Sequence, residues 1–307
     1  MDNILIFGHK NPDTDSICSS IVKEILNKKN GCEDSKAVRL GNINKETQYV
    51  LDYLKIDAPE LIEKVEEGQK VILVDHNDFS QSVDNIENAQ IIGVVDHHRI
   101  GNFKTIEPLY FTARPYGCTA TILYQDFVQK NIKIEKTEAV LMASAIISDT
   151  LLLKSPTTTE HDKKALEELA KLAEIDVNTY GLEMLKAGTN LDALSTTELI
   201  NLDAKCLSKE DTKYVIAQVN TVSIDDVLKR ETELKEVINK EIEEKGLSLF
   251  VFAITDILNS NSEMIVLGEK ANVIKPAFGK ELENDKVFLE GVVSRKKQIL
   301  PFIDKNM

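Results

Sequence analysis

The sequence predicts an α/β protein in which a parallel-sheet N-terminal domain is followed by a smaller, mixed α/β C-terminal domain. Three observations predict this class. Short β-branched runs alternate with helical patterns in the first half of the chain, as in βαβ units. A polar stretch with a glycine, residues 186–192, separates this half from a second α/β pattern. The length of 307 residues fits two domains of roughly 150 residues each.

The first half supplies the elements of the parallel sheet. Runs rich in Ile, Val and Leu predict strands over residues 3–7, 37–40, 71–74 and 91–95. Apolar residues at helical spacing predict helices over residues 17–27, 46–54, 119–130, 137–147 and 159–173. In such sheets the ligand-binding groups gather at the carboxyl ends of the strands.

The second half repeats the alternation with a longer helix. We expect a charged helix over residues 224–245, and strands over residues 214–219, 249–254, 264–267 and 288–293. The last strand is expected to run directly into Ser294-Arg295-Lys296-Lys297. The corresponding domains are residues 1–187 and 196–307, joined by a hinge over residues 188–195.

Composition excludes several classes of protein. The formal net charge of −14 disfavours binding to nucleic acid. No apolar run approaches the roughly 20 residues of a membrane helix, and the N-terminus lacks the features of a signal peptide. The four scattered cysteines favour reduced thiols over disulfides or a zinc-thiolate site. We therefore expect a cytoplasmic protein with no nucleic-acid or membrane partner.

Acidic and imidazole side chains gather where the apolar runs end. GHKNPDTDS (residues 8–16), VDH (74–76) and VDHHR (95–99) follow or end expected strands, and SDT (148–150) ends an expected helix. Taken singly, each acid could be a helix cap and each histidine a structural one. Together, carboxylates at one sheet edge repel one another unless a cation neutralises them, and neutral imidazole binds divalent transition metals. The cluster therefore predicts a metal site.

The spacing of these ligands favours two ions. Asp13 and Asp15 are two residues apart in an expected loop whose side chains alternate in direction, so they would point at different ions. An aspartate on a neighbouring strand, such as Asp75, could bridge both ions. Two ions about 3.5–4 Å apart can share a hydroxide and hold a phosphoryl group in line. Carboxylates mixed with histidines favour manganese, then cobalt, over zinc, with magnesium arriving with the substrate.

Five motifs in this order, the four above and SRKKQ (residues 294–298), resemble those of the family II, manganese-dependent inorganic pyrophosphatases. These enzymes belong to the DHH phosphoesterase superfamily and have a C-terminal domain of the DHHA2 type. The resemblance covers essentially the whole chain. It implies that a metal-bridging hydroxide hydrolyses pyrophosphate to two phosphates at a dinuclear manganese or cobalt centre in the cleft between the domains. It also implies a homodimer formed through the N-terminal sheet.

The resemblance also implies residue roles. One ion would be held by His9, Asp13 and Asp75, and the other by Asp15, Asp75, His97 and Asp149. Asp75 and Asp15 would then be catalytic as metal ligands. His98 would contact the substrate and help to protonate the leaving group. The phosphate oxygens would be bound by Lys205, Arg295 and Lys296, of which Lys205 rests wholly on the resemblance.

Some residues near the motifs keep open roles. His76 could orient Asp75 by hydrogen bonding, and Lys297 is a weaker candidate for binding phosphate oxygens. Asn77 and Asp96 have no assigned role, and His161 is expected to be structural. Only residues 77–94 separate VDH from VDHHR. That segment leaves no room for the paired CBS modules by which some family members sense nucleotides, so we expect no such regulation.

Several rival functions remain. A DHH phosphodiesterase acting on short oligonucleotides or cyclic dinucleotides shares the first motifs but ends in a glycine-rich GGGH-like segment, and this chain contains no Gly-Gly pair. A polyphosphate-cleaving relative usually departs from the DHH motif. A non-catalytic metal-binding or phosphate-binding regulator usually loses a ligand, but every expected position is filled here. A structural protein with simple capping acids is the last alternative.

Overall fold

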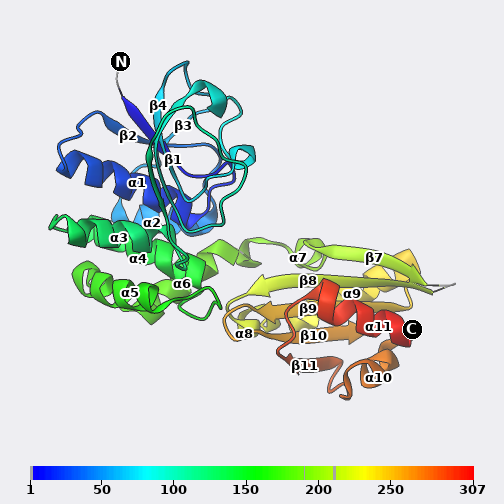
Figure 1. The fold of residues 1–307 in the computed structure, drawn as a ribbon. Helices are drawn as coiled ribbons and strands as arrows, with labels where there is room; N and C mark the ends of the chain where they lie inside the picture. Colours follow the sequence, from blue (N-terminus) through cyan, green and yellow to red (C-terminus); the bar gives the residue numbers. More distant parts are fainter. Residues whose placement is uncertain (1–2, 190, 210–211) are drawn as a thin grey trace. The chain divides into compact units, whose positions relative to one another are not determined.

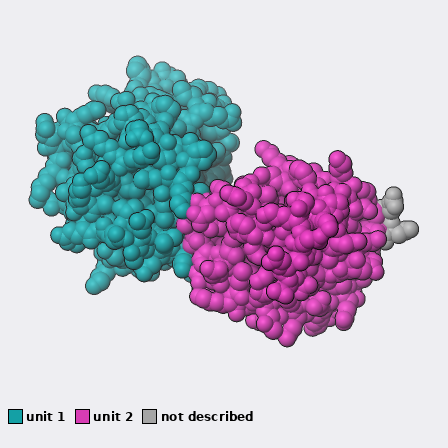
Figure 2. Space-filling view, turned by 90° about the horizontal axis from the view of Figure 1, so that it is seen from below, with its two compact units in different colours: residues 1–188 teal, residues 189–307 magenta. Residues whose placement is uncertain are grey.

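The computed structural model describes residues 3–189, 191–209 and 212–307 and divides into two compact units, residues 1–188 and 189–307 (Figures 1 and 2). The predicted α/β class is confirmed, with a parallel sheet in the first unit and a mixed sheet in the second. The expected hinge includes residue 190, which lies outside the described residues. The residues just before it are helical, because helix α6 (Val177–Thr189) continues through Gly188.

The first unit is built on six parallel strands in the order β3-β2-β1-β4-β5-β6. Their bounds are β1 (Ile4–Phe7), β2 (Ser35–Arg39), β3 (Glu60–Leu61), β4 (Lys70–Val74), β5 (Gln90–Asp96) and β6 (Tyr110–Ala113). The chain runs outward in one direction from β1 and in the other from β4. The order therefore reverses between β1 and β4, where open α/β sheets bind their ligands.

Helices cover one face of this sheet in successive layers (Figure 1). Besides α6 they are α1 (Thr14–Lys29), α2 (Lys45–Leu54), α3 (Thr119–Gln129), α4 (Lys136–Thr150) and α5 (Glu160–Ala173). Helices α1 and α3 pack on the strands. Helix α4 packs on α1 and α3, and α5 packs on α4. The other face packs against residues of the segments between β3 and β5, such as Val65, Val83 and Ile86. Burial on both faces explains why the strands are nearly continuous apolar runs.

Helix α1 begins earlier than the apolar spacing predicted. Asp13 is its N-cap, and its Oδ1 atom accepts a hydrogen bond from the Ser16 backbone N–H at 3.0 Å. The cap brings Thr14, Asp15 and Ser16 into the first turn, where all three are buried. The acids of the first motif therefore lie on a rigid helix start at the end of β1.

The second unit contains a five-stranded mixed sheet in the order β11-β10-β9-β8-β7. Its strands are β7 (Ala204–Lys209), β8 (Thr212–Thr221), β9 (Leu249–Asp256), β10 (Asn261–Leu267) and β11 (Lys286–Glu290). Among the described strands of this second sheet, only β8 and β9 pair in parallel, and the other neighbours are antiparallel. One face packs on α7 (Thr196–Asn201), α8 (Ile224–Leu228) and α9 (Glu231–Lys245). The other packs on α10 (Ile274–Phe278) and α11 (Leu300–Asn306).

Several predicted elements need correction. The single helix over residues 224–245 is two helices, α8 and α9, separated at Lys229 and Arg230. The last strand ends at Glu290 because Gly291 takes a left-handed φ of 71°. Arg295 therefore lies in a separate helical turn, Arg295–Ile299, capped by Ser294. Strands β3, β6 and β7 and helices α6, α7, α10 and α11 were not predicted. No helix in the described part of the chain is long and apolar enough to cross a membrane.

The close approach of β1 and α1 yields a first prediction. A Cβ atom at Gly8 would lie 2.8 Å from the Cα of Ser16, so Gly8→Ala must push the start of α1 away from the sheet. We expect a loss of about 1–3 kcal/mol in the free energy of unfolding, measured by urea denaturation. The control is Gly93→Ala, where the nearest atoms lie at ordinary contact distances of 3.5–3.7 Å. An equal loss in both variants would contradict the steric argument.

Candidate metal centre

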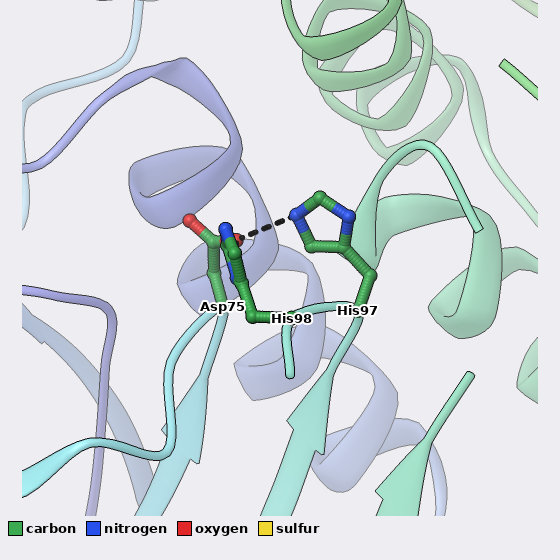
Figure 3. Close-up of side chains that lie close together, drawn as sticks. All are labelled: Asp75, His97 and His98. Atoms are coloured by element: carbon green, nitrogen blue, oxygen red, sulfur yellow. Dashed lines mark ion pairs between the residues drawn. The ribbon is translucent and has the colours of Figure 1, made fainter. Parts of the chain in front are cut away.

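The ends of β1, β4 and β5 and the last turn of α4 bring acids and imidazoles together in the first unit. His9 Nε2 lies 3.4 Å from both Asp13 Oδ2 and Asp75 Oδ2. His97 Nε2 lies 3.4 Å from Asp75 Oδ1 and 3.6 Å from Asp149 Oδ2. Figure 3 shows His97 and His98 at the end of β5 beside Asp75, with the His97–Asp75 ion pair dashed. The four motifs thus converge on one place.

These side chains form two sets that could each hold a metal ion. The first is His9, Asp13 and Asp75, and the second is Asp15, Asp75, His97 and Asp149. In each set one ligand atom per residue lies within 4.8 Å of the others. Asp75 belongs to both sets, with Oδ2 toward His9 and Oδ1 toward His97.

The backbone at Asp75 takes an unusual conformation. Its φ of 57° is left-handed, which costs a non-glycine residue of order 1–3 kcal/mol and is often found at functional sites. The Asp75 N–H donates to the Val95 carbonyl at 3.0 Å and so remains tied to β5. The carboxylate accepts hydrogen bonds from Ser16 Oγ at 2.9 Å and Thr119 Oγ1 at 3.3 Å. Each oxygen is therefore held in a fixed direction.

The N-terminus of α3 holds Asp15. The Thr119 and Ala120 backbone N–H groups donate to Oδ2 and Oδ1 at 2.7 and 3.2 Å, and Ser19 Oγ donates to Oδ1 at 2.6 Å. The first N–H groups of a helix have no partner within the helix and favour an anion. They keep a fully buried carboxylate in place.

The ring of His97 is oriented by a backbone carbonyl. Its Nδ1 lies 3.0 Å from the Tyr116 carbonyl, which can only accept, so Nδ1 carries a proton. In a neutral ring Nε2 then keeps its lone pair and faces Asp75 and Asp149. This arrangement is typical of histidines that bind metals.

Asp149 lies at the end of α4, next to a strained turn. Leu151, Leu152 and Leu153 take φ values of 47°, 54° and 65°, so the helix ends abruptly after the acid. The preceding Ser148 hydroxyl donates to Glu46 Oε1, which also accepts from Thr14 Oγ1 at 2.6 Å. Glu46 therefore links the segments that carry Asp149 and Asp15.

The electrostatics of the cluster fit a divalent cation. Burial and repulsion from Asp75 raise the pKa of Asp15 to about 6. Burial and the neighbouring acids raise the pKa of Asp149 well above its usual range. Burial opposes the charge on Asp75, but hydrogen bonds from His9 and His97 hold its pKa well below its usual range. Bound cations would relieve this repulsion, and the mixed oxygen and imidazole ligands suit manganese.

His98 lies beside the two ligand sets: its Nδ1 is 3.7 Å from Asp75 Oδ1, and with Asp75 and His97 it forms a third group that could hold a metal ion. Its Nδ1 and backbone N–H lie 2.9 and 3.1 Å from Asp96 Oδ1, and the Asn77 amide donates to Asp96 Oδ2. The hydrogen bond to Asp96 outweighs burial and raises the pKa of His98. About half of the side chain is exposed, so Nε2 is available to a ligand.

His76 does not orient Asp75 as the sequence suggested. Its Nδ1 lies 2.9 Å from the Val74 carbonyl, and its Nε2 has no hydrogen-bond partner among the described residues. The ring is buried, and its centroid lies 6.2 Å from that of Phe7. His76 is therefore part of the packing beneath the site.

The predicted cationic residues lie in the second unit. Lys205 is an exposed residue of β7, and Lys296 and Lys297 are exposed in the turn after Ser294. The Arg295 guanidinium lies 2.9 Å from Asp203 Oδ1 and also donates to the Asp203 carbonyl. These residues belong to a separate unit from the ligand cluster.

Sequence reasoning missed the supporting residues Ser16, Ser19, Glu46, Tyr116 and Thr119. Their groups carry no signal of their own, because serine, threonine and glutamate are common in helices and every residue has a backbone carbonyl. Only the fold shows that they face the cluster.

Comparison with known proteins decides the family. The DHH family N-terminal domain model matches residues 3–146, and the DHHA2 domain model matches residues 182–306. The manganese-dependent inorganic pyrophosphatase of Bacillus subtilis (strain 168) is 52% identical over 308 residues, covering 100% of this chain and 99% of that protein. The chain belongs to the manganese-dependent inorganic pyrophosphatase family.

Other members of the pyrophosphatase family agree. An Exiguobacterium sp. protein assigned to it is 53% identical over 304 residues, which cover 99% of this chain and 98% of that protein. The crystal structure of a Methanococcus jannaschii protein assigned to the family II inorganic pyrophosphatases has a TM-score of 0.62 and 38% identity, with 99% of each chain covered. The family predicted from the five motifs is therefore confirmed.

Proposed function

We propose that this chain hydrolyses inorganic pyrophosphate to two phosphates at a dinuclear manganese centre. The observation that carries the proposal is the pair of ligand sets that share Asp75. Full-length identity of 52% to the manganese-dependent pyrophosphatase of Bacillus subtilis supports it. The chain has no room for a regulatory CBS insert between its motifs.

The two ligand sets would hold the two ions, which are Mn²⁺ or Co²⁺. His9, Asp13 and Asp75 would bind one, and Asp15, Asp75, His97 and Asp149 the other. When bound, such ions lower the pKa of a coordinated water and neutralise phosphoryl charge, which is the chemistry that an anhydride hydrolysis needs. Further Mg²⁺ or Mn²⁺ would arrive with the substrate.

The chain's own residues contribute orientation and proton transfer. Ser16 and Thr119 hold the two oxygens of Asp75 in different directions, so one carboxylate can serve both ions. His98 Nδ1 donates to Asp96, which stabilises the imidazolium and leaves the Nε2 proton for the leaving phosphate oxygen. Asp75 and Asp15 thus act in catalysis as metal ligands, and His98 acts as a general acid.

Substrate binding would involve both units. We assign residues 1–187 as the metal-binding catalytic domain, residues 188–195 as a hinge linker and residues 196–307 as the substrate-binding domain. Arg295 offers a planar fork of donors to phosphate oxygens, and Lys205 and Lys296 offer point charges. The cytoplasm is the compartment we assign, since all four cysteines are free and reduced thiols are usual there.

The test is phosphate release by metal-stripped protein reloaded separately with manganese, cobalt, zinc or magnesium. Pyrophosphate, tripolyphosphate and a short RNA are offered in parallel. We expect fast release from pyrophosphate with manganese or cobalt, because carboxylate and imidazole ligands together favour these ions. Nucleotide release from RNA with pyrophosphate inert would replace the proposal by a phosphodiesterase. No release from any substrate would favour a binding protein.

We also propose that the protein is a homodimer formed through β6. This strand is an edge of the sheet, and edge strands offer unpaired backbone groups to a second chain. Tyr110 on β6 is 89% exposed, and Ile106 just before it is fully exposed. Pairing of two such edges would cover both apolar side chains.

The dimer is tested with the double variant Ile106→Asp/Tyr110→Asp, because buried charge opposes association. Light scattering after size exclusion should give twice the chain mass for the native protein and a single chain mass for the variant. The control is Leu61→Asp on β3, the opposite edge, where the side chain is 43% exposed. Monomeric native protein, or dissociation only by Leu61→Asp, would refute this interface.

A further inference from the structure

A row of polar side chains crosses one face of the second unit's sheet. It lies beside the helical turn that carries Arg295, Lys296 and Lys297, here called the basic turn. The row comprises Gln218 on β8, Thr255 on β9 and Ser262 on β10. The rest of this face is apolar, with Ile216, Val251 and Met264 in its core. Thr255 and Ser262 are almost fully buried. Buried hydroxyls and amides are unfavourable unless they are hydrogen-bonded, so their partners identify what the row does.

Hydrogen bonds run along the row in one direction. Gln218 Nε2 donates to Thr255 Oγ1 at 2.7 Å. Thr255 therefore has its own proton for Ser262 Oγ, which lies 2.8 Å away. Ser262 in turn donates to the Val292 carbonyl at 2.7 Å. Each hydroxyl has one proton, so the first and last bonds determine which hydroxyl donates. Hydrogen bonds within such a chain strengthen one another.

Gln218 also binds the basic turn directly. Its Nε2 donates to the Val293 carbonyl at 2.9 Å, and its Oε1 accepts from the Arg295 N–H at 3.1 Å. These partners determine which amide atom is oxygen, because a carbonyl only accepts and an N–H only donates. The Gln218 backbone N–H donates at 3.2 Å to the Asp203 carbonyl, which also accepts from the Arg295 guanidinium.

The turn is closed locally by another residue. Gln298 Oε1 accepts from the Val293 and Ser294 N–H groups, each at 3.1 Å, and its Nε2 donates to the Gly291 carbonyl at 2.8 Å. Gln298 thus shapes the turn, whereas the polar row attaches it to the sheet. Val292, Val293 and Arg295 are the points of attachment.

We propose that Gln218 is a positioning residue for substrate binding, which holds Arg295 and Lys296 in place through the polar row. This inference rests on the proposed function, in which these two cations bind phosphate oxygens. Without Gln218, the turn loses the hydrogen bonds at the Val293 carbonyl and the Arg295 N–H, so more of the ordering of Arg295 and Lys296 falls to the substrate. That ordering weakens binding.

The experiment measures binding of imidodiphosphate, a non-hydrolysable analogue of pyrophosphate, to the manganese-loaded protein by calorimetry. Gln218→Met keeps the side-chain length but makes no hydrogen bonds, and should raise Kd roughly tenfold, as expected for a lost hydrogen bond. Thr255→Val interrupts the row and should give a smaller increase. Bound manganese should be unchanged in both.

The control is Tyr214→Phe, on the same strand and face. Its hydroxyl donates to Asp304 Oδ1 at 2.8 Å, away from the turn, so its loss should reduce stability without changing Kd. An equal rise of Kd in this variant would indicate a general loss of packing and overturn the proposal.

A double-mutant cycle with Arg295→Ala separates the possible failures. If Gln218 acts through the turn, Kd of the double variant rises by less than the product of the two single effects. Fully multiplicative effects would overturn the positioning role. Weaker binding in Arg295→Ala but native binding in Gln218→Met would overturn this inference alone. Native binding in Arg295→Ala would overturn the phosphate-binding assignment and this inference with it.

Discussion

The rest of the site depends on the contacts that the Asp75 carboxylate makes with both histidines. Asp75 faces His9 with one oxygen and His97 with the other and is the residue common to both ligand sets. A buried acid with this many neighbours is unfavourable unless each oxygen has a defined partner. The left-handed backbone at Asp75, the Ser16 hydroxyl and the Thr119 hydroxyl all serve to aim it.

The fold explains how one residue can meet both sets. Asp75 follows β4, next to β1 and β5 in the sheet, so His9 and His97 approach it from opposite sides. The reversal of strand order between β1 and β4 opens the carboxyl ends of the strands to a ligand. Helix α3 then holds Asp15 with its first N–H groups, and α4 supplies Asp149.

Much of the fold and of the candidate metal centre could be predicted from sequence, because the motifs that indicate them are short and local. Apolar runs ending at Asp75 and His97 predicted two strands, the run ending at Asp149 predicted a helix, and all three acids and imidazoles were candidate metal ligands. The strand β6 and the turn at Arg295 could not be predicted, since β6 is a short exposed edge and the turn depends on Gly291 and on Gln218 from a distant strand. Glu46 was missed for the same reason, because its partners Thr14 and Ser148 meet only in the folded chain.

The most direct test of the shared carboxylate is the number and coupling of bound Mn²⁺ ions per chain, measured by equilibrium dialysis with electron paramagnetic resonance. We expect two exchange-coupled ions in the native protein. Asp75→Ala should lose one ion and the coupling, together with nearly all activity, while circular dichroism reports an intact fold. Two coupled ions or native activity in Asp75→Ala would contradict the bridging role, as would a single ion in the native protein.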